Sequence, residues 1–236
     1  MQVYEPARIE GSHGQYAAAG SRSVNANTFG ASAHKLAGSA YTLEQVITAG
    51  IANCKRACAP YGALTALDVG PLGELLEPSG TLAFEDAVAE YARIVKAGEA
   101  AGADLIFFET YTDLYELKAA LLAAKENTHL PILASMSFEA GGRTFTGCTV
   151  ESFAATARGL GADAVGINCS LGPKEIFPMA KRLTEAVPGN FPVFVKPNAG
   201  LPRADGSGYD ITPQLFALEM KPYRELNLFA AGGRCG

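Results

Sequence analysis

The feature that most constrains the fold is a regular alternation of short apolar runs with longer helix-forming stretches. Seven runs rich in β-branched or apolar residues begin 28 to 41 residues apart, at 21–27, 62–70, 103–110, 131–138, 162–170, 191–198 and 227–233. The gaps between them carry helical patterns, with apolar residues at three- and four-residue spacing. Strand, helix and strand in repetition predict a parallel β-sheet with right-handed crossovers.

The clearest helical stretch covers 84–102, where Gly98 and Gly102 are predicted stop signals. Thr149 lies three residues before Ser152 and is the predicted N-cap of the helical stretch that begins there. Residues 13–22 read as the end of an earlier helix that leads into the first apolar run. The strand at 103–110 is apolar on both faces, as expected for a strand that helices cover on both sides.

Two architectures fit this alternation, an open doubly wound sheet and a closed (β/α)8 TIM barrel. The open sheet favours a glycine-rich fingerprint after an early strand, and the sequence has none. The barrel predicts polar or reactive residues at many strand ends, because all eight loops build one face. The strand ends carry such residues: Asn25, Asn27, Asp68, Glu109, Thr110, Ser137, Asn168, Cys169, Lys196, Asn198 and Cys235.

The number of strands falls short of a closed barrel, which needs eight. The strand expected before the helix that ends near Arg22 is missing, and so is the helix expected after Gly236. We therefore expect one α/β domain over 1–236, a (β/α)8 barrel that is truncated at both ends.

Composition excludes several classes of protein. Hydrophobic residues make up 48% of the 236 residues and charged residues 18%, so a large core can form. The net charge of −5 gives no basis for binding nucleic acid or an anionic membrane surface. No apolar run approaches the ~18 residues that span a bilayer. Five unevenly spaced cysteines argue against a disulfide scaffold and favour a reducing cytoplasm.

Cys169 and Cys235 each follow an apolar strand, so a barrel would bring them together across its mouth. Paired thiolates suit a metal such as zinc, although small buried cysteines are also common in cores. Cys54 and Cys58 lie four residues apart on a predicted helix, where a structural role on one helix face is favoured. Cys148 lies in a loop or at a helix start and has no assigned role. No role is assigned to the three histidines, His13, His34 and His129.

Two charged residues end strands. Glu109 ends the most apolar strand, where a carboxylate either binds a cationic group or acts as a tuned acid or base, unless it forms a structural ion pair. Lys196 also ends a strand, and a desolvated lysine in a barrel can form a Schiff base. A Schiff-base aldolase that uses Lys196 is therefore one alternative function.

Five motifs resemble the homocysteine S-methyltransferase family. They are GINCSLGP at 166–173, PNAGLP at 197–202, NTFGA at 27–31, FFETYTDLYELKAAL at 107–121 and GG-x-CG at 232–236. The stretch ALDVGPLGELLEPSG at 66–80 is most similar to the N-terminal homocysteine-binding module of the family's cobalamin-dependent methionine synthase branch. The resemblance runs from about Tyr16 to Gly236.

The resemblance implies a zinc-dependent enzyme that transfers a methyl group to the sulfur of homocysteine and yields methionine. The family holds zinc with three cysteines, of which Cys169 and Cys235 match the first and last, while Arg234 occupies the remaining position. Glu109 matches the residue that engages the homocysteine amino group. The supporting positions of the family fall on Asn27, Asn168 and Asn198. An Asp-Gly motif of the family's first strand has no counterpart.

The resemblance also implies partners. A methylcorrinoid would donate the methyl group, and the folate- and cobalamin-binding domains or subunits that handle it are absent from this chain. Arg234 and the truncation are expected to impair the fragment. The alternatives are the Lys196 aldolase and a zinc-free, non-catalytic barrel remnant.

Overall fold

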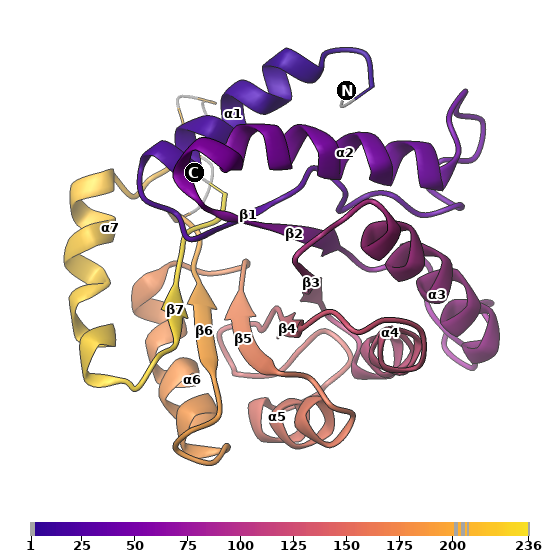
Figure 1. Ribbon diagram of the computed structural model, residues 1–236. Helices are drawn as coiled ribbons and strands as arrows, with labels where there is room; N and C mark the ends of the chain where they lie inside the picture. The colour runs from indigo at the N-terminus through magenta and orange to yellow at the C-terminus, as the bar shows by residue number, and fades with distance from the viewer. Residues whose placement is uncertain (1–2, 201–202, 204–205, 207, 236) are drawn as a thin grey trace. The chain divides into compact units, whose positions relative to one another are not determined.

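The computed structural model describes residues 3–200, 203, 206 and 208–235, so Leu201, Pro202 and Gly236 of the motifs above lie outside the described residues. Within this part of the chain, strands occupy all seven predicted positions (Figure 1). The strands are β1 Ser23–Asn25, β2 Leu64–Val69, β3 Leu105–Tyr111, β4 Ile132–Met136, β5 Ala164–Asn168, β6 Val193–Lys196 and β7 Ala230–Ala231.

Helices fill the gaps between the strands, as the spacing of apolar residues predicts. They are α1 Pro6–Ala18, α2 Leu43–Cys58, α3 Phe84–Ala100, α4 Leu114–Asn127, α5 Val150–Gly159, α6 Pro173–Glu185 and α7 Pro213–Glu219, with short 3-10 helices η1 Ala59–Tyr61 and η2 Lys221–Glu225. The predicted N-cap is confirmed, because the Thr149 side chain accepts a hydrogen bond of 3.2 Å from the backbone N–H of Ser152. Among the described residues, no helix has both the length and the apolar character needed to cross a membrane.

The chain divides into two compact units. Unit 1 holds the residues up to Glu109 together with Tyr115–Ile132, and unit 2 holds Thr110–Leu114 together with the residues from Leu133 onward. In unit 1, β1 pairs with β2 and β2 with β3, both in parallel. In unit 2, β4, β5, β6 and β7 pair in that order, again in parallel. The parallel strands with intervening helices confirm the predicted α/β class.

In unit 1, the interior of the sheet is apolar on both faces. The side chains of Leu105, Ile106, Phe107 and Phe108 on β3 are all buried, which confirms the two-faced strand predicted from the sequence. Buried aliphatic and aromatic side chains of this size each contribute about 1.5–3 kcal/mol relative to exposure. The apolar strands therefore supply the rigid frame from which the strand-end residues project.

Gly98 does not end a helix, so this part of the sequence prediction is wrong. Helix α3 continues to Ala100, and a Cβ atom at Gly98 would lie 2.3 Å from Cδ2 of Leu67 on β2. A side chain at this position would collide with the buried Leu67 side chain, which explains a glycine inside the helix. The stop is at Gly102, whose φ of 87° places it in the left-handed region just beyond the C-cap.

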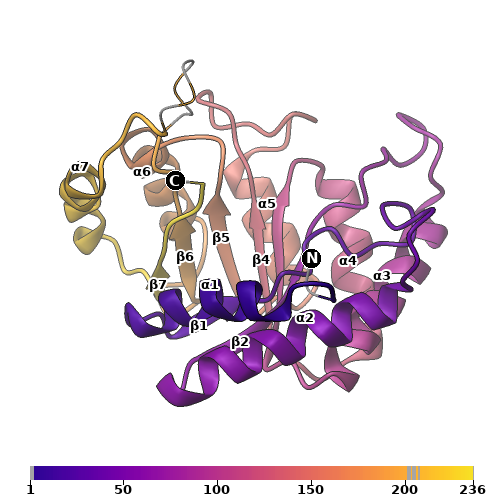
Figure 2. The same ribbon diagram turned by 90° about the horizontal axis from the view of Figure 1, so that it is seen from above.

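Helix α1 lies beside α2 in unit 1 (Figure 2). The guanidinium of Arg56 on α2 donates hydrogen bonds of 2.6 and 2.9 Å to the Glu10 carboxylate on α1. His13 of α1 is 8% exposed, and its Nε2 has no hydrogen-bond partner among the described residues. Burial lowers the pKa of His13 below its usual range, because the charged form is disfavoured away from water.

This buried histidine predicts a pH dependence of stability. Its pKa is higher in the unfolded chain than in the folded one, so the unfolded state binds more protons once the pH falls below about 6.5. We expect the free energy of unfolding to decrease from pH 8 to pH 5.5 by up to about 1.4 kcal/mol per unit of pKa depression. Urea unfolding of His13→Gln should show a smaller decrease than the parent chain. His129→Gln is the matched control, because the His129 side chain is fully exposed, and an equal decrease in all three proteins would contradict the prediction.

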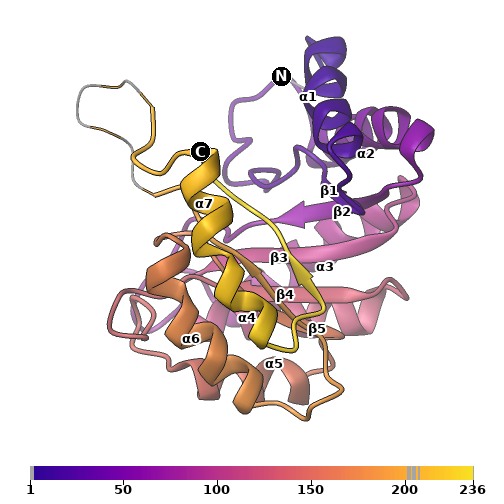
Figure 3. The same ribbon diagram turned by 90° about the vertical axis from the view of Figure 1, so that its left-hand side faces the viewer.

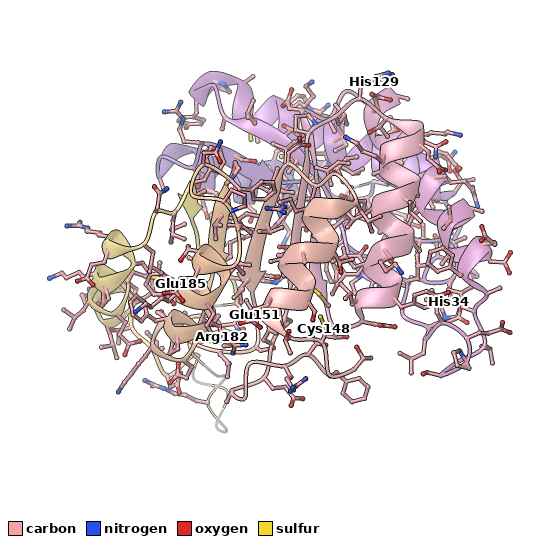
Figure 4. All side chains as sticks on the ribbon, turned by 90° about the horizontal axis from the view of Figure 1, so that it is seen from below. His34, His129, Cys148, Glu151, Arg182 and Glu185 are labelled. Atoms are coloured by element: carbon pink, nitrogen blue, oxygen red, sulfur yellow. The ribbon has the colours of Figure 1, made fainter. Side chains whose placement is uncertain are left out.

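In unit 2, α5 and α6 are joined by a bidentate ion pair. Arg182 donates from Nε and Nη2 to the Glu151 carboxylate at 2.8 and 2.9 Å, and Figure 4 shows the two side chains meeting. Helix α7 lies along α6 and next to β7 (Figure 3). These helices lie beside β5, β6 and β7, and the two predicted site cysteines follow β5 and β7.

Candidate functional site

The two cysteines of the predicted site occupy unusual backbone conformations in unit 2. Cys169 follows β5 directly with φ of 64°, and its neighbour Ser170 has φ of 63°. Cys235 follows β7 with φ of 43°. Residues other than glycine are uncommon at positive φ, and such strain concentrates at functional sites, where the surrounding structure must hold it in place.

Backbone hydrogen bonds hold these conformations. Segment 197–199 follows β6 and lies between the two cysteine-bearing loops. On one side, the N–H of Cys169 donates to the carbonyl of Lys196 at 3.2 Å. On the other side, the N–H of Ala199 donates to the carbonyl of Cys235 at 3.0 Å. The end of β6 therefore fixes the spacing between the loops and brings the two cysteines together.

Cys169 and Cys235 are near neighbours, because the Cys235 thiol is among the groups that, after burial, raise the pKa of Cys169. Burial raises the pKa of Cys169, while hydrogen bonds from the Ser170 N–H and the Asn198 side chain partly oppose this increase. Asn198 is 6% exposed, and its Oδ1 has no hydrogen-bond partner among the described residues. The two thiols and the side-chain amide of Asn198 therefore lie close together.

This donor set does not fit a three-thiolate zinc site. Zinc sites in proteins use at least three protein ligands, and thiolate and imidazole are its preferred donors. The described residues include no group of three or more His, Cys, Asp or Glu side chains placed to hold a metal ion. Arg234 occupies the position between Gly233 and Cys235 and contributes a cation in place of a thiolate. The pair is therefore one thiol short.

A polar network that the sequence did not predict lies beside this pair. Asn168 is fully buried, and its Oδ1 accepts hydrogen bonds from Ser135 Oγ at 2.7 Å and from the Thr110 N–H at 3.1 Å. Its Nδ2 donates to Thr110 Oγ1 at 2.7 Å. The hydroxyls of Ser137 and Ser170 also share a short hydrogen bond. Serine on alternate positions of 131–138 was the available signal, because alternate residues of a strand share one face.

Two of the predicted substrate-binding residues, Glu109 and Asn27, belong to unit 1. Glu109 lies on β3 and is 1% exposed, whereas Asn27 lies in the loop after β1 and is exposed. Beside Asn27, the Thr28 hydroxyl donates to the Asp68 carbonyl at 2.8 Å and accepts from the Asp68 N–H at 3.1 Å. This double hydrogen bond fixes the loop after β1 to the end of β2 and so sets the position of Asn27.

Lys196 ends β6 and is partly buried, where its side chain packs on the backbone of the last strand. A Cβ atom at Gly232 would lie 3.2 Å from Cγ of Lys196. The described residues add no observation that favours Schiff-base chemistry at this lysine.

The other cysteines and the histidines lie elsewhere. Cys54 and Cys58 are buried on α2 with sulfur atoms 3.8 Å apart, which confirms the predicted helix-face role, and burial raises the pKa of Cys54 to about 12. Cys148 precedes α5, and burial raises its pKa to about 11. His34 pairs with a glutamate at 2.7 Å, and Figure 4 shows it far from His129 within unit 1.

Comparison with known proteins identifies relatives of this chain. Methionine synthase of Mycobacterium tuberculosis is 30% identical over 248 residues, an alignment that covers 98% of this chain and 20% of that protein. Methionine synthase of Mycobacterium leprae is 34% identical over 143 residues, which is 57% of this chain and 12% of that protein. The chain thus spans about a fifth or less of the length of these relatives.

Solved structures show the same fold. The homocysteine methyltransferase MmuM from Escherichia coli, in its oxidized form, superposes with a TM-score of 0.81 at 21% identity, covering 99% of this chain and 82% of that one. Its metallated form gives a TM-score of 0.77 at 22% identity over the same shares of both chains. These likenesses confirm the barrel class predicted from the sequence. The model of the family described as "Homocysteine S-methyltransferase" matches residues 1–236, and the chain therefore belongs to the homocysteine S-methyltransferase family.

Proposed function

We propose that this chain is a homocysteine-binding module that takes part in methyl transfer to the sulfur of homocysteine, with methionine as the product. The observation that carries the proposal is that segment 197–199 lies between Cys169 and Cys235, which follow β5 and β7 at positive φ in a chain of this family. The family membership gives no support to the Schiff-base aldolase alternative.

The proposed roles of the side chains follow from their chemistry. The buried Glu109 carboxylate would bind the ammonium group of homocysteine, since a charge-assisted hydrogen bond is strong away from water. Asn27 and Asn198 would support the substrate, and Asn168 would act through its neighbours. A free thiol has a pKa of about 8.5, so most homocysteine is protonated at neutral pH and must lose its proton before it attacks a methyl group.

Zinc would serve that purpose in this family, but the donor set of the described residues is one thiol short. We therefore propose that the chain binds zinc weakly and substoichiometrically through Cys169 and Cys235, and we assign substrate binding to the chain itself. The methyl donor would be a methylated corrinoid on other domains or subunits, since the matching methionine synthases are about five times longer. Folate-binding domains would be partners of the same kind.

The test compares two ligands that differ in one atom. Isothermal titration in saturating zinc chloride should show L-homocysteine binding at least about tenfold more tightly than L-homoserine, which carries oxygen in place of sulfur and is a poorer ligand for soft sites. Equal affinities would contradict the proposal. Borohydride treatment with carbonyl substrates should leave Lys196 unmodified, whereas a trapped adduct would favour the aldolase.

A further inference from the structure

We propose that Asn168 is a positioning residue that holds Thr110 in its left-handed conformation and thereby fixes the peptide group that follows Glu109. The proposal rests on the homocysteine-binding function proposed above, and it deepens that function by assigning Asn168 an indirect role. Asn168 would set the direction of the carboxylate-bearing strand end without touching the substrate.

The side chain of Asn168 makes its hydrogen bonds to other residues of unit 2. Its Oδ1 accepts two hydrogen bonds, from the backbone N–H of Thr110 and from the hydroxyl of Ser135, at 3.1 and 2.7 Å. Its Nδ2 donates to Thr110 Oγ1 at 2.7 Å, and the whole residue is 0% exposed. Because a backbone N–H can only donate, the orientation of the amide is fixed by this network. No surface of Asn168 is open to a ligand.

Thr110 needs such a restraint. It has φ of 66°, and a β-branched residue at positive φ is a genuine outlier that persists only where its surroundings hold it. Asn168 makes two hydrogen bonds to this residue: it accepts one from the Thr110 backbone N–H and donates one to the Thr110 hydroxyl. The next residue is held as well, since the Ser137 N–H donates to the Tyr111 carbonyl at 2.9 Å.

The link to Glu109 is covalent. The N–H of Thr110 belongs to the peptide group that joins Glu109 to Thr110, so the hydrogen bond to Asn168 orients that peptide plane. Loss of the restraint would let Thr110 relax toward negative φ and would rotate the chain directly after the carboxylate. Misplacement of a binding group by about 1 Å is enough to weaken a site severely.

A double-mutant cycle between Asn168→Ala and Thr110→Gly tests the restraint. Glycine adopts positive φ without strain, so it should tolerate the loss of Asn168 better than threonine does. We expect Asn168→Ala to weaken homocysteine binding roughly 10- to 100-fold by isothermal titration, and the double variant to bind within about threefold of Thr110→Gly alone. Ser135→Ala is the control, since it removes one partner of Asn168 and leaves both contacts to Thr110.

The unfolding equilibrium distinguishes failure of the positioning role of Asn168 from failure of the proposed homocysteine-binding function. In urea, the unfolding equilibrium constant of the double variant should differ at least about threefold from the value expected if the effects of Asn168→Ala and Thr110→Gly were independent. Additive effects, or a double variant that binds as weakly as Asn168→Ala alone, would overturn the positioning role. If the parent chain binds no homocysteine, the proposed function fails, while additivity in urea still decides whether the restraint exists.

Discussion

Arg234→Cys is expected to convert weak, substoichiometric zinc binding into the binding of one zinc ion per chain. The substitution supplies the third thiolate and removes a fixed positive charge from the loop beside Cys169 and Cys235. A single positive charge about 4 Å from a divalent ion costs on the order of 8 kcal/mol at an effective dielectric constant near 20, an upper bound for a partly exposed arginine. We expect affinity for zinc to rise at least about a thousandfold, which corresponds to about 4 kcal/mol.

Zinc titration against a chromophoric chelator measures this change, and cobalt substitution reports thiolate ligation through its absorption spectrum. Two control variants separate the causes. Arg234→Ser removes the charge without adding a donor, and Arg234→Lys keeps the charge. Zinc affinity should therefore increase in the order Lys, Ser, Cys at position 234. Tight binding of one zinc ion by the parent chain would show that the ligands lie elsewhere.

Glu109→Gln is expected to weaken homocysteine binding by about 10- to 150-fold in zinc-loaded Arg234→Cys protein. The carboxylate is 1% exposed, and a hydrogen bond to a charged group contributes about 1.5–3 kcal/mol. Glutamine has the same size and loses only the charge, so the loss measures recognition of an ammonium group. Glu185→Gln is the matched control, because Glu185 is an exposed carboxylate at the end of α6, labelled in Figure 4.

A ligand that lacks the amino group sharpens this prediction. 4-Mercaptobutyrate has the thiol and the carboxylate of homocysteine but no ammonium group. Protein with Glu109 should prefer homocysteine over this analogue, and Glu109→Gln should bind the two with similar affinity. An undiminished preference in Glu109→Gln would place the ammonium group against some other side chain and would remove Glu109 from the proposed site.

Most of the fold could be predicted because strand and helix signals are local. Each of the seven strands lies where an apolar run ends in polar residues, and the cap at Thr149 follows from its own neighbours. The error at Gly98 has a tertiary cause, since the contact with Leu67 is invisible in a helical pattern. A glycine in a helical pattern usually indicates the end of the helix, but packing against a strand can also require a glycine inside a helix.

The candidate site was only partly predictable. That its cysteines lie near each other could be expected from the rule that parallel strands present their ends at one edge, and in the structure backbone hydrogen bonds link both cysteine loops to the end of β6. The hydrogen bonds of Asn168 join residues 33 and 58 positions apart in the chain, and no local pattern encodes which partners an amide will choose. The roles of Glu109, Asn27 and Asn198 toward homocysteine stay predictions.

The burial of Cys54 and Cys58 separates these two cysteines from the exposed Cys235 in their rates of reaction with alkylating reagents. Only a thiolate reacts, and the burial that leaves Cys54 0% exposed also raises the pKa of its thiol to about 12. Cys235 is exposed and should be modified at once, whereas Cys54 and Cys58 can react only when α2 separates from the strands beneath it. The rate at which these two thiols are alkylated therefore measures how often unit 1 opens, and mass spectrometry can follow that rate without any engineered probe.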